Sequence, residues 1–266
     1  MAAAAYPFAT ALVTGASSGI GEAMVRRLAR AGVATVVVAR RRRRLSDLAA
    51  ELTAAPGEVE VLAADLATSR GVARVEERLT DLDRPIDLLV NNAGFGTSGR
   101  VAEIEPARLR DEIGVNVMAL TALTRAALPS MIERQRGWIL NVSSVASFQP
   151  APRLAVYAAS KAYVTSFTEA LHEELRGTGV HATVLCPGLT RTEFIQVSRG
   201  EAAATAYPGA AWMSAEAVAT EGLRDAARGR ALSVPGVQYK AFVTSAGFIP
   251  RGVMRRMSGM VASRLR

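Results

Sequence analysis

Three residue types that often build reactive sites are scarce in this chain. Two lysines stand against 30 arginines in 266 residues, and there are only two histidines, His172 and His181, and one cysteine, Cys186. A single cysteine permits no intrachain disulfide, which is typical of a reducing compartment, and its place at the end of an apolar stretch predicts a buried, inert thiol. Two histidines without a cysteine cluster do not make a metal site.

Long hydrophobic runs and a leader-like start are also lacking. No stretch approaches ~18 uninterrupted apolar residues, which argues against a membrane-spanning helix. Residues 1–7 have neither the basic region nor the apolar region of a secretory signal. These absences, with the single cysteine, predict a cytoplasmic protein. The net charge is +8, but the arginines are scattered apart from one dense run, so we exclude nucleic acid as the main partner.

Apolar segments alternate with amphipathic ones along most of the chain. Strands are predicted near residues 8–13, 35–39, 59–63, 86–90, 138–142, 180–186 and 231–234. Helices are predicted after the first strand to residue 31, and near 44–54, 69–82, 106–133, 155–177 and 214–228. This alternation predicts one α/β domain with a mainly parallel, doubly wound sheet flanked by helices on both faces. We expect residues 1–236 to form that domain and residues 237–266 to be an amphipathic C-terminal extension of it.

One of the two lysines lies four residues after a tyrosine, as Tyr157 and Lys161. From five tyrosines and two lysines in 266 residues, chance gives about 0.04 such pairs. On a helix the two side chains face the same way, one turn apart. A compact ammonium beside a phenol can do work that an arginine cannot. The alternative is an accidental exposed pair.

A glycine-rich turn follows the first predicted strand. It contains Gly15, Gly19 and Gly21, and helical periodicity begins directly after it. Strand, glycine turn and helix is the context of a dinucleotide site, because glycines let the backbone approach a pyrophosphate and helix N–H groups attract its charge. The residues that we expect to contact the cofactor in this turn are Thr14, Gly15, Ser17, Ser18, Gly19, Ile20 and Gly21.

The turn and the Tyr157–Lys161 pair together resemble the short-chain dehydrogenase/reductase family. Further signals follow in the family's order and spacing over residues 8–192. The resemblance implies a Rossmann-type fold, a homodimer or homotetramer built on helices 106–133 and 155–177, and a catalytic set of Asn116, Ser144, Tyr157 and Lys161. It also implies further cofactor contacts at Asp65, Leu66, Asn92, Ala93, Gly94, Tyr157, Lys161, Pro187, Gly188, Thr190 and Thr192.

The end of the second predicted strand carries arginines instead of an acidic residue. A carboxylate here would bind the ribose 2′-hydroxyl of NAD. Arg40 and Arg41 stand there instead and can clamp a 2′-phosphate. The cofactor predicted is therefore NADP(H), whereas residues 42–44 are interpreted as a solvated helix start.

The resemblance assigns each catalytic group a role. Tyr157 would be the acid/base for a proton on the substrate oxygen, and the Lys161 ammonium would favour its phenolate and hold the nicotinamide ribose. Ser144 would bind the carbonyl or alkoxide oxygen. Asn116 would orient a water that joins Lys161 to solvent.

The substrate predicted is a medium-sized apolar ketone, aldehyde or secondary alcohol. The segments expected around it contribute Phe95, Val145, Phe148, Leu154, Phe194, Ile195, Trp212 and Met213. These side chains could equally close a loop over the cofactor. A non-catalytic NADP(H)-binding regulator or scaffold on the same fold remains the alternative function, and an epimerase or dehydratase with retained cofactor a third.

The C-terminal extension ends in a basic amphipathic segment. Its apolar residues are Val253, Met254, Met257, Met260, Val261 and Leu265, opposite several arginines. Such a helix can dock on its own sheet, on a partner subunit or peripherally on an anionic membrane. The sequence leaves these three alternatives open.

Overall fold

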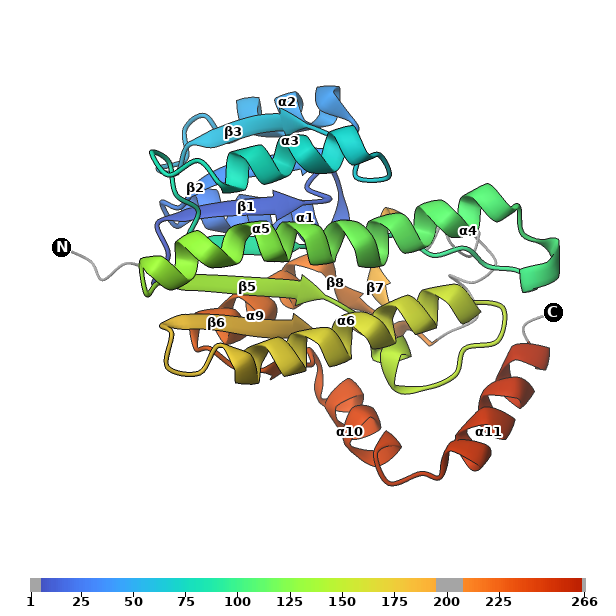
Figure 1. Ribbon diagram of the computed structural model, residues 1–266. Coiled ribbons are helices and arrows are strands. Elements are labelled where there is room, and N and C mark those ends of the chain that lie inside the picture. Colours follow the sequence, from blue (N-terminus) through green and yellow to red (C-terminus); the bar gives the residue numbers. More distant parts are fainter. Residues whose placement is uncertain (1–5, 195–207, 265–266) are drawn as a thin grey trace.

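A seven-stranded parallel sheet forms the centre of the computed structural model, which describes residues 6–194 and 208–264. The strand order is β3-β2-β1-β4-β5-β6-β9, with helices on both faces (Figure 1). The strands are β1 (Thr10–Thr14), β2 (Ala34–Ala39), β3 (Val59–Ala63), β4 (Leu88–Asn91), β5 (Gly137–Val142), β6 (Val180–Leu185) and β9 (Leu232–Ser233). The predicted Rossmann-type, doubly wound sheet is confirmed, and the seven predicted strands all occur.

Two layers of helices cover the sheet. On one face α1 (Gly19–Arg30), α2 (Arg42–Glu51) and α9 (Ala215–Ala227) pack around Leu28, Leu45 and Leu223. On the other face α3 (Ser69–Leu79), α5 (Leu120–Glu133) and α6 (Ala155–Glu174) pack around Val75, Leu123 and Leu171. Because helices bury both faces, the central strands are continuous apolar runs; β5 is buried at every position.

The predicted helix 106–133 is three consecutive helical segments. These are α4 (Pro106–Ile113), the π-helical turn η2 (Gly114–Ala119) and α5. Among the described residues, this run alone is long and apolar enough to cross a membrane. It nevertheless packs against β4, β5 and α3, with Leu120, Leu123 and Met131 in the core. Its hydropathy is therefore that of a helix covering a sheet.

The predicted C-terminal extension consists of two helices, α10 (Val237–Ala246) and α11 (Arg251–Arg264), which diverge from the sheet as a V (Figure 1). Met254 of α11 is buried, whereas Val253, Met257 and Met260 are 49%, 47% and 59% exposed. The apolar stripe of α11 is thus only partly covered by this chain. Leu265 lies outside the described residues.

Candidate active site

A cavity of about 640 Å³ lies beyond the carboxyl ends of the central strands. It collects most of the residues selected from the sequence: Gly15, Ser17, Ser18, Gly19, Ile20, Arg40, Arg41, Asp65, Leu66, Asn92, Ala93, Gly94, Ser144, Tyr157, Lys161, Pro187, Gly188, Thr190 and Thr192. Three of the selected residues, Thr14, Gly21 and Asn116, do not line it. These three lie behind the wall, and their contacts hold the wall in place.

Thr14 joins the ends of two neighbouring strands. Its hydroxyl donates to the Val90 carbonyl (3.2 Å) and accepts the N–H groups of Asn92 and Ala93 (both 3.0 Å). The Asn92 side-chain amide returns a hydrogen bond to the Thr14 carbonyl (2.9 Å). Thr14 is 1% exposed and does not line the cavity. Its hydrogen bonds hold together the loops that follow β1 and β4, and both of these loops line the cavity.

The glycine turn is as compact as the sequence indicates. Gly15 and Gly19 have φ angles of +66° and +59°, which glycine adopts without strain. A Cβ at Gly21 would lie 2.4 Å from the Asn92 side-chain nitrogen and 2.5 Å from the Gly15 carbonyl oxygen. Gly21 is therefore required for packing behind the turn. In front of it, the start of α1 lines the cavity at Gly19 and Ile20, and the Ser18 side chain makes no capping hydrogen bond.

One end of the cavity is walled by Ser17 and by arginines at the start of α2. Arg41 donates from Nε and Nη2 to the Ser17 hydroxyl (3.1 and 2.9 Å) and from Nη1 to Glu193 (2.8 Å). Arg44, interpreted from the sequence as solvated, is 52% exposed and also pairs with Glu193, a partner that the sequence did not indicate. Arg40 lines the cavity and is exposed. Of the two arginines chosen from the sequence, Arg41 makes the side-chain contacts.

The opposite end contains Tyr157 and Lys161, one turn apart on α6 and 8% and 5% exposed. The Lys161 ammonium lies 5.8 Å from the centre of the Tyr157 ring and donates to the Val142 carbonyl (2.8 Å). Burial lowers the pKa of Lys161 to about 8. A Cβ at Gly94 would lie 2.9 Å from the Asn116 side-chain oxygen and 3.3 Å from the Lys161 nitrogen, so the turn after β4 passes close to both side chains. The pair is thus built into the wall, and the alternative of an accidental exposed pair is wrong.

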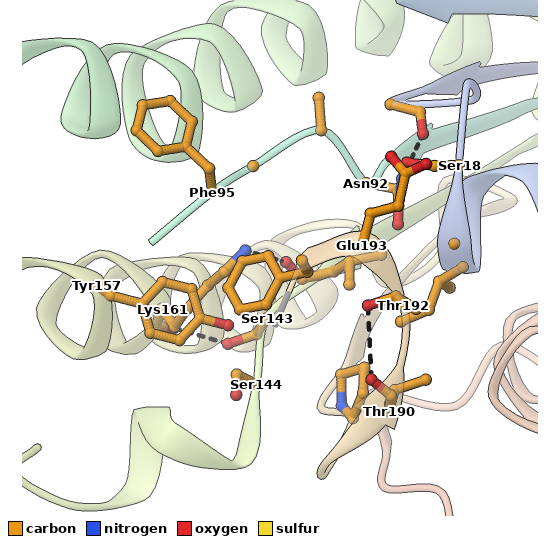
Figure 2. Close-up of a pocket in the computed structure, with 18 of the residues that line it drawn as sticks. Ser18, Asn92, Phe95, Ser143, Ser144, Tyr157, Lys161, Thr190, Thr192 and Glu193 are labelled. Carbon is orange, nitrogen blue, oxygen red and sulfur yellow. Dashed lines mark hydrogen bonds between the residues drawn. The ribbon is translucent and has the colours of Figure 1, made fainter. Parts of the chain in front are cut away.

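Two serines follow β5, and both line the cavity. Ser143 is buried, donates to the Lys161 carbonyl (2.8 Å) and contacts Thr165 (2.8 Å). Ser144 lines the cavity, and its hydroxyl accepts the Ala146 N–H (3.1 Å) at the start of the short helix η3 (Val145–Phe148). Figure 2 shows Ser144, Tyr157 and Lys161 at the same end of the cavity.

Asn116 lies in the π-helical turn η2 and is 1% exposed. Its amide nitrogen donates to the Phe95 carbonyl (2.8 Å) and to the Ser160 hydroxyl (3.0 Å), and its oxygen accepts the Phe95 N–H (3.0 Å). Both amide protons are therefore used within the protein. Asn116 ties the segment after β4 to α6, the helix that carries Tyr157 and Lys161.

The C-terminal extension contributes side chains that sequence reasoning did not select. Tyr239 and Phe242 of α10 line the cavity. The Tyr239 hydroxyl accepts the Leu189 N–H (3.0 Å) and donates to the Ala211 carbonyl (2.6 Å), and its ring covers Gly188, where a Cβ would be 2.1 Å away. Aromatic residues three apart in residues 237–249 were the available signal.

The predicted pocket segments are only partly in the wall. Phe95, Val145 and Phe194 line the cavity, whereas Phe148, Leu154, Trp212 and Met213 do not, and Ile195 lies outside the described residues. Leu154 is buried, so its apolar character serves packing. Cys186 is also buried, and burial raises the pKa of its thiol to about 11, in line with the predicted inert thiol.

The chain belongs to the short-chain dehydrogenase family, whose model matches residues 9–202. A short chain dehydrogenase of Pseudocercospora fijiensis is 41% identical over 187 residues, which are 69% of this chain and 60% of that relative's length. A short-chain dehydrogenase from Sphingobium yanoikuyae, solved in complex with NADPH, is 33% identical with a TM-score of 0.83, covering 92% of this chain and 94% of that one. A family member from Burkholderia phymatum, solved with NAD, is 29% identical with a TM-score of 0.76, covering 88% and 91%. The chain thus belongs to an oxidoreductase family. Members of this family have been solved with NADPH and with NAD.

Proposed function

We propose that this protein transfers a hydride between NADP(H) and a carbonyl or secondary alcohol substrate. One observation carries the proposal: Tyr157 and Lys161 are buried together in the wall of a cavity whose other end is walled by Arg41. A protein that only bound a nucleotide would need neither the Ser144 hydroxyl nor the Tyr157 phenol in the cavity wall. The non-catalytic regulator therefore remains the less supported alternative.

The residues that wall the cavity fit a dinucleotide. A Cβ at Gly15 would lie 2.7 Å from the Asn92 side chain and 2.9 Å from the Ala93 Cα. The glycine turn therefore packs closely against the loop after β4, and a pyrophosphate could approach its backbone because no side chain intervenes. Helix N–H groups at Gly19 and Ile20 would attract its charge. We assign the remaining contacts to Asp65, Leu66 and Asn92–Gly94 at the adenosine side, and to Pro187, Gly188, Thr190 and Thr192 at the nicotinamide side. NADP(H), when bound, supplies or accepts the hydride.

The protein's own groups handle the proton and the substrate oxygen. Tyr157 gives a proton to the oxygen in reduction and removes it in oxidation, and the Ser144 hydroxyl donates a hydrogen bond to that oxygen as charge develops. The Lys161 ammonium provides positive charge beside the phenol. Asn116 keeps α6 in register with the segment after β4, so we propose a positioning role for it.

The preference for NADP(H) over NAD(H) rests on Arg41. Arg41 follows the end of β2, where an NAD site carries a carboxylate. Its side chain is oriented by hydrogen bonds to Ser17. A guanidinium matches the geometry and charge of a 2′-phosphate.

The substrate end of the cavity supports a medium-sized apolar ketone, aldehyde or secondary alcohol. Its wall contains Phe95, Val145, Phe194, Tyr239 and Phe242. Apolar walls with a few polar groups are typical of sites that bind such molecules.

The test is NADPH oxidation at 340 nm over a panel of aliphatic, aromatic and steroid-like ketones and aldehydes, with NADH in parallel. We expect turnover with apolar carbonyl compounds and with NADPH preferred. The matched control is Tyr157→Phe, which must abolish the signal. Tight NADPH binding without turnover on any of the panel would favour the regulator.

Further proposals concern partners and location. Homodimers or homotetramers would use the surface of α4–α6, where Ile113, Met118 and Tyr163 are 44%, 65% and 41% exposed. Sedimentation equilibrium tests the assembly.

Peripheral membrane contact would use the basic helix α11, and vesicle co-sedimentation tests it. A cytoplasmic location is consistent with the buried, unpaired Cys186.

A further inference from the structure

The arginine end of the cavity contains a carboxylate that belongs to the chain itself. Glu193 follows β7 (Thr190–Arg191), which pairs with β8 (Met213–Ser214) beside the cavity. Its two oxygens reach Arg41 (2.8 Å) and Arg44, both from the start of α2. Within residues 6–194 and 208–264, no other carboxylate forms an ion pair with residues 40–44.

The three nitrogens of the Arg41 guanidinium are divided between two partners. Nε and Nη2 donate to the Ser17 hydroxyl, and Nη2 also donates to the Ser17 carbonyl (3.2 Å). Nη1 donates to Glu193. Arg41 is therefore oriented by Ser17 through two of its nitrogens, and Glu193 contacts the third.

Glu193 is charged at neutral pH. The Arg41 hydrogen bond, then that of Arg44, holds the pKa of its carboxyl below the usual range. The three side chains are 36–52% exposed, so the pairs are screened by water and can be exchanged for a stronger anion. A 2′-phosphate carries more negative charge than a carboxylate and three acceptor oxygens, as phosphate monoesters do.

The neighbouring residue reaches the other end of the cavity. The Phe194 ring lies 5.3 Å from the Tyr157 ring at an angle of 45°. Consecutive residues therefore touch the arginines and the catalytic tyrosine.

We propose that Glu193 is a specificity-determining residue: its carboxylate is an internal competitor for the guanidinium groups that bind the cofactor's 2′-phosphate. The inference rests on the proposed NADP(H) preference and deepens it. A 2′-phosphorylated nucleotide displaces Glu193 and gains Arg41 Nη1 and Arg44. A nucleotide without that phosphate leaves the ion pairs intact. Part of the affinity for NADP(H) is thus lost to the displacement, which favours release after turnover.

The test is isothermal titration calorimetry of the full chain with adenosine 2′,5′-diphosphate and with 5′-ADP. The proteins are the wild type, Glu193→Gln, Arg41→Ala and a matched control, Glu103→Gln. Glu103 pairs with Arg100 on the surface, at 60% and 63% exposure, and does not line the cavity. Glu193→Gln removes the competing charge and keeps the side chain's size.

We expect Glu193→Gln to bind adenosine 2′,5′-diphosphate about threefold to tenfold more tightly, consistent with removing an exposed ion pair. Its affinity for 5′-ADP should stay within twofold, and Glu103→Gln should match the wild type for both. Unchanged or weaker binding of adenosine 2′,5′-diphosphate by Glu193→Gln would contradict the proposal that Glu193 competes with the phosphate. Weaker binding would mean that Glu193 helps to orient Arg41 for the phosphate.

Failure of the underlying preference has a different signature. A wild type that binds the two nucleotides equally, with no effect of Arg41→Ala, removes the 2′-phosphate site and the competitor with it. A wild type that discriminates through Arg41 while Glu193→Gln changes nothing removes only the competitor.

Discussion

The two ends of the cavity both use positive charge, and they place it in opposite environments. At the arginine end, Arg41 and Arg44 are 42% and 52% exposed. At the end that contains Tyr157, Lys161 is 5% exposed, and burial brings its pKa down to about 8. An exposed guanidinium keeps its charge at any physiological pH, whereas a buried ammonium is charged at a cost in stability. The first end is suited to capturing a ligand, and the second to tuning a reaction.

The same contrast explains why the chain has a lysine at position 161. Arginine supplies most of the exposed positive charge, as in residues 40–44. Lys161 lies beside Gly94 and donates to Val142, and its compact ammonium differs in shape from a planar guanidinium. Lys240, the other lysine, is 50% exposed in a pair with Glu221, so it provides a natural control for the buried one.

The largest effect is expected at the buried end, from Tyr157→Phe. Removing the phenol hydroxyl should reduce kcat by about 10²–10⁴-fold, because proton transfer loses its donor. NADPH affinity should stay within a few-fold, since the ring and its packing remain. Steady-state kinetics and a binding titration measure the two quantities. Unchanged kcat would sink the assigned mechanism.

The second-largest effect concerns the free energy of unfolding and is expected from Lys161→Met. Lys161 titrates near pH 8 when folded and near 10.5 when unfolded, so its folded-state burial is unfavourable while it is protonated. That penalty is complete below pH 8 and disappears as pH rises from 8 to 10.5. Lys161→Met should therefore raise the free energy of unfolding by about 1–3 kcal/mol at pH 7, less the lost hydrogen bond to Val142, and by less at pH 10.5.

Urea unfolding at the two pH values checks this, with Lys240→Met as the control. The control should change stability little at either pH, because its ion pair is exposed. A Lys161→Met protein that is less stable than the wild type at pH 7 would show that the ammonium is well compensated. The two ends would then differ in exposure but not in electrostatic cost.

The smallest of these effects is expected at the exposed end. Arg41→Ala should weaken NADPH binding roughly tenfold, the value of one charge-assisted hydrogen bond in a partly screened site. NADH binding should change less than threefold. Arg40→Ala, at a neighbouring residue whose side chain is exposed, should have a smaller effect than Arg41→Ala. Equal losses for both cofactors in fluorescence titrations would remove the 2′-phosphate argument.

The sequence allowed the sheet and most of the cavity wall to be predicted because the signals are local. Each strand is a short apolar run, and the residues after it must gather at one edge of a parallel sheet. Gly15, Asn92, Ser144 and Pro187 were found in this way, and all four line the cavity.

The residues that were missed are placed by contacts between distant segments. Glu193 meets Arg41 across 152 positions, and Tyr239 meets Leu189 across 50. No pattern within either segment indicates its partner. Thr14 and Asn116 show the converse. Motif position predicted Thr14 as a cofactor contact and Asn116 as catalytic, but it could not indicate that both side chains lie behind the cavity wall.

The contact between Tyr239 and Gly188 shows that two different parts of the chain build the cavity wall. The family model matches residues 9–202, which carry Arg41, Tyr157, Lys161 and most of the cavity wall. Tyr239 and Phe242 line the cavity from outside that stretch. A relative can therefore share every motif of the first part and still have a different cavity wall. We expect an exchange of α10 between family members to change which molecules the cavity accepts while Tyr157 and Lys161 stay in place.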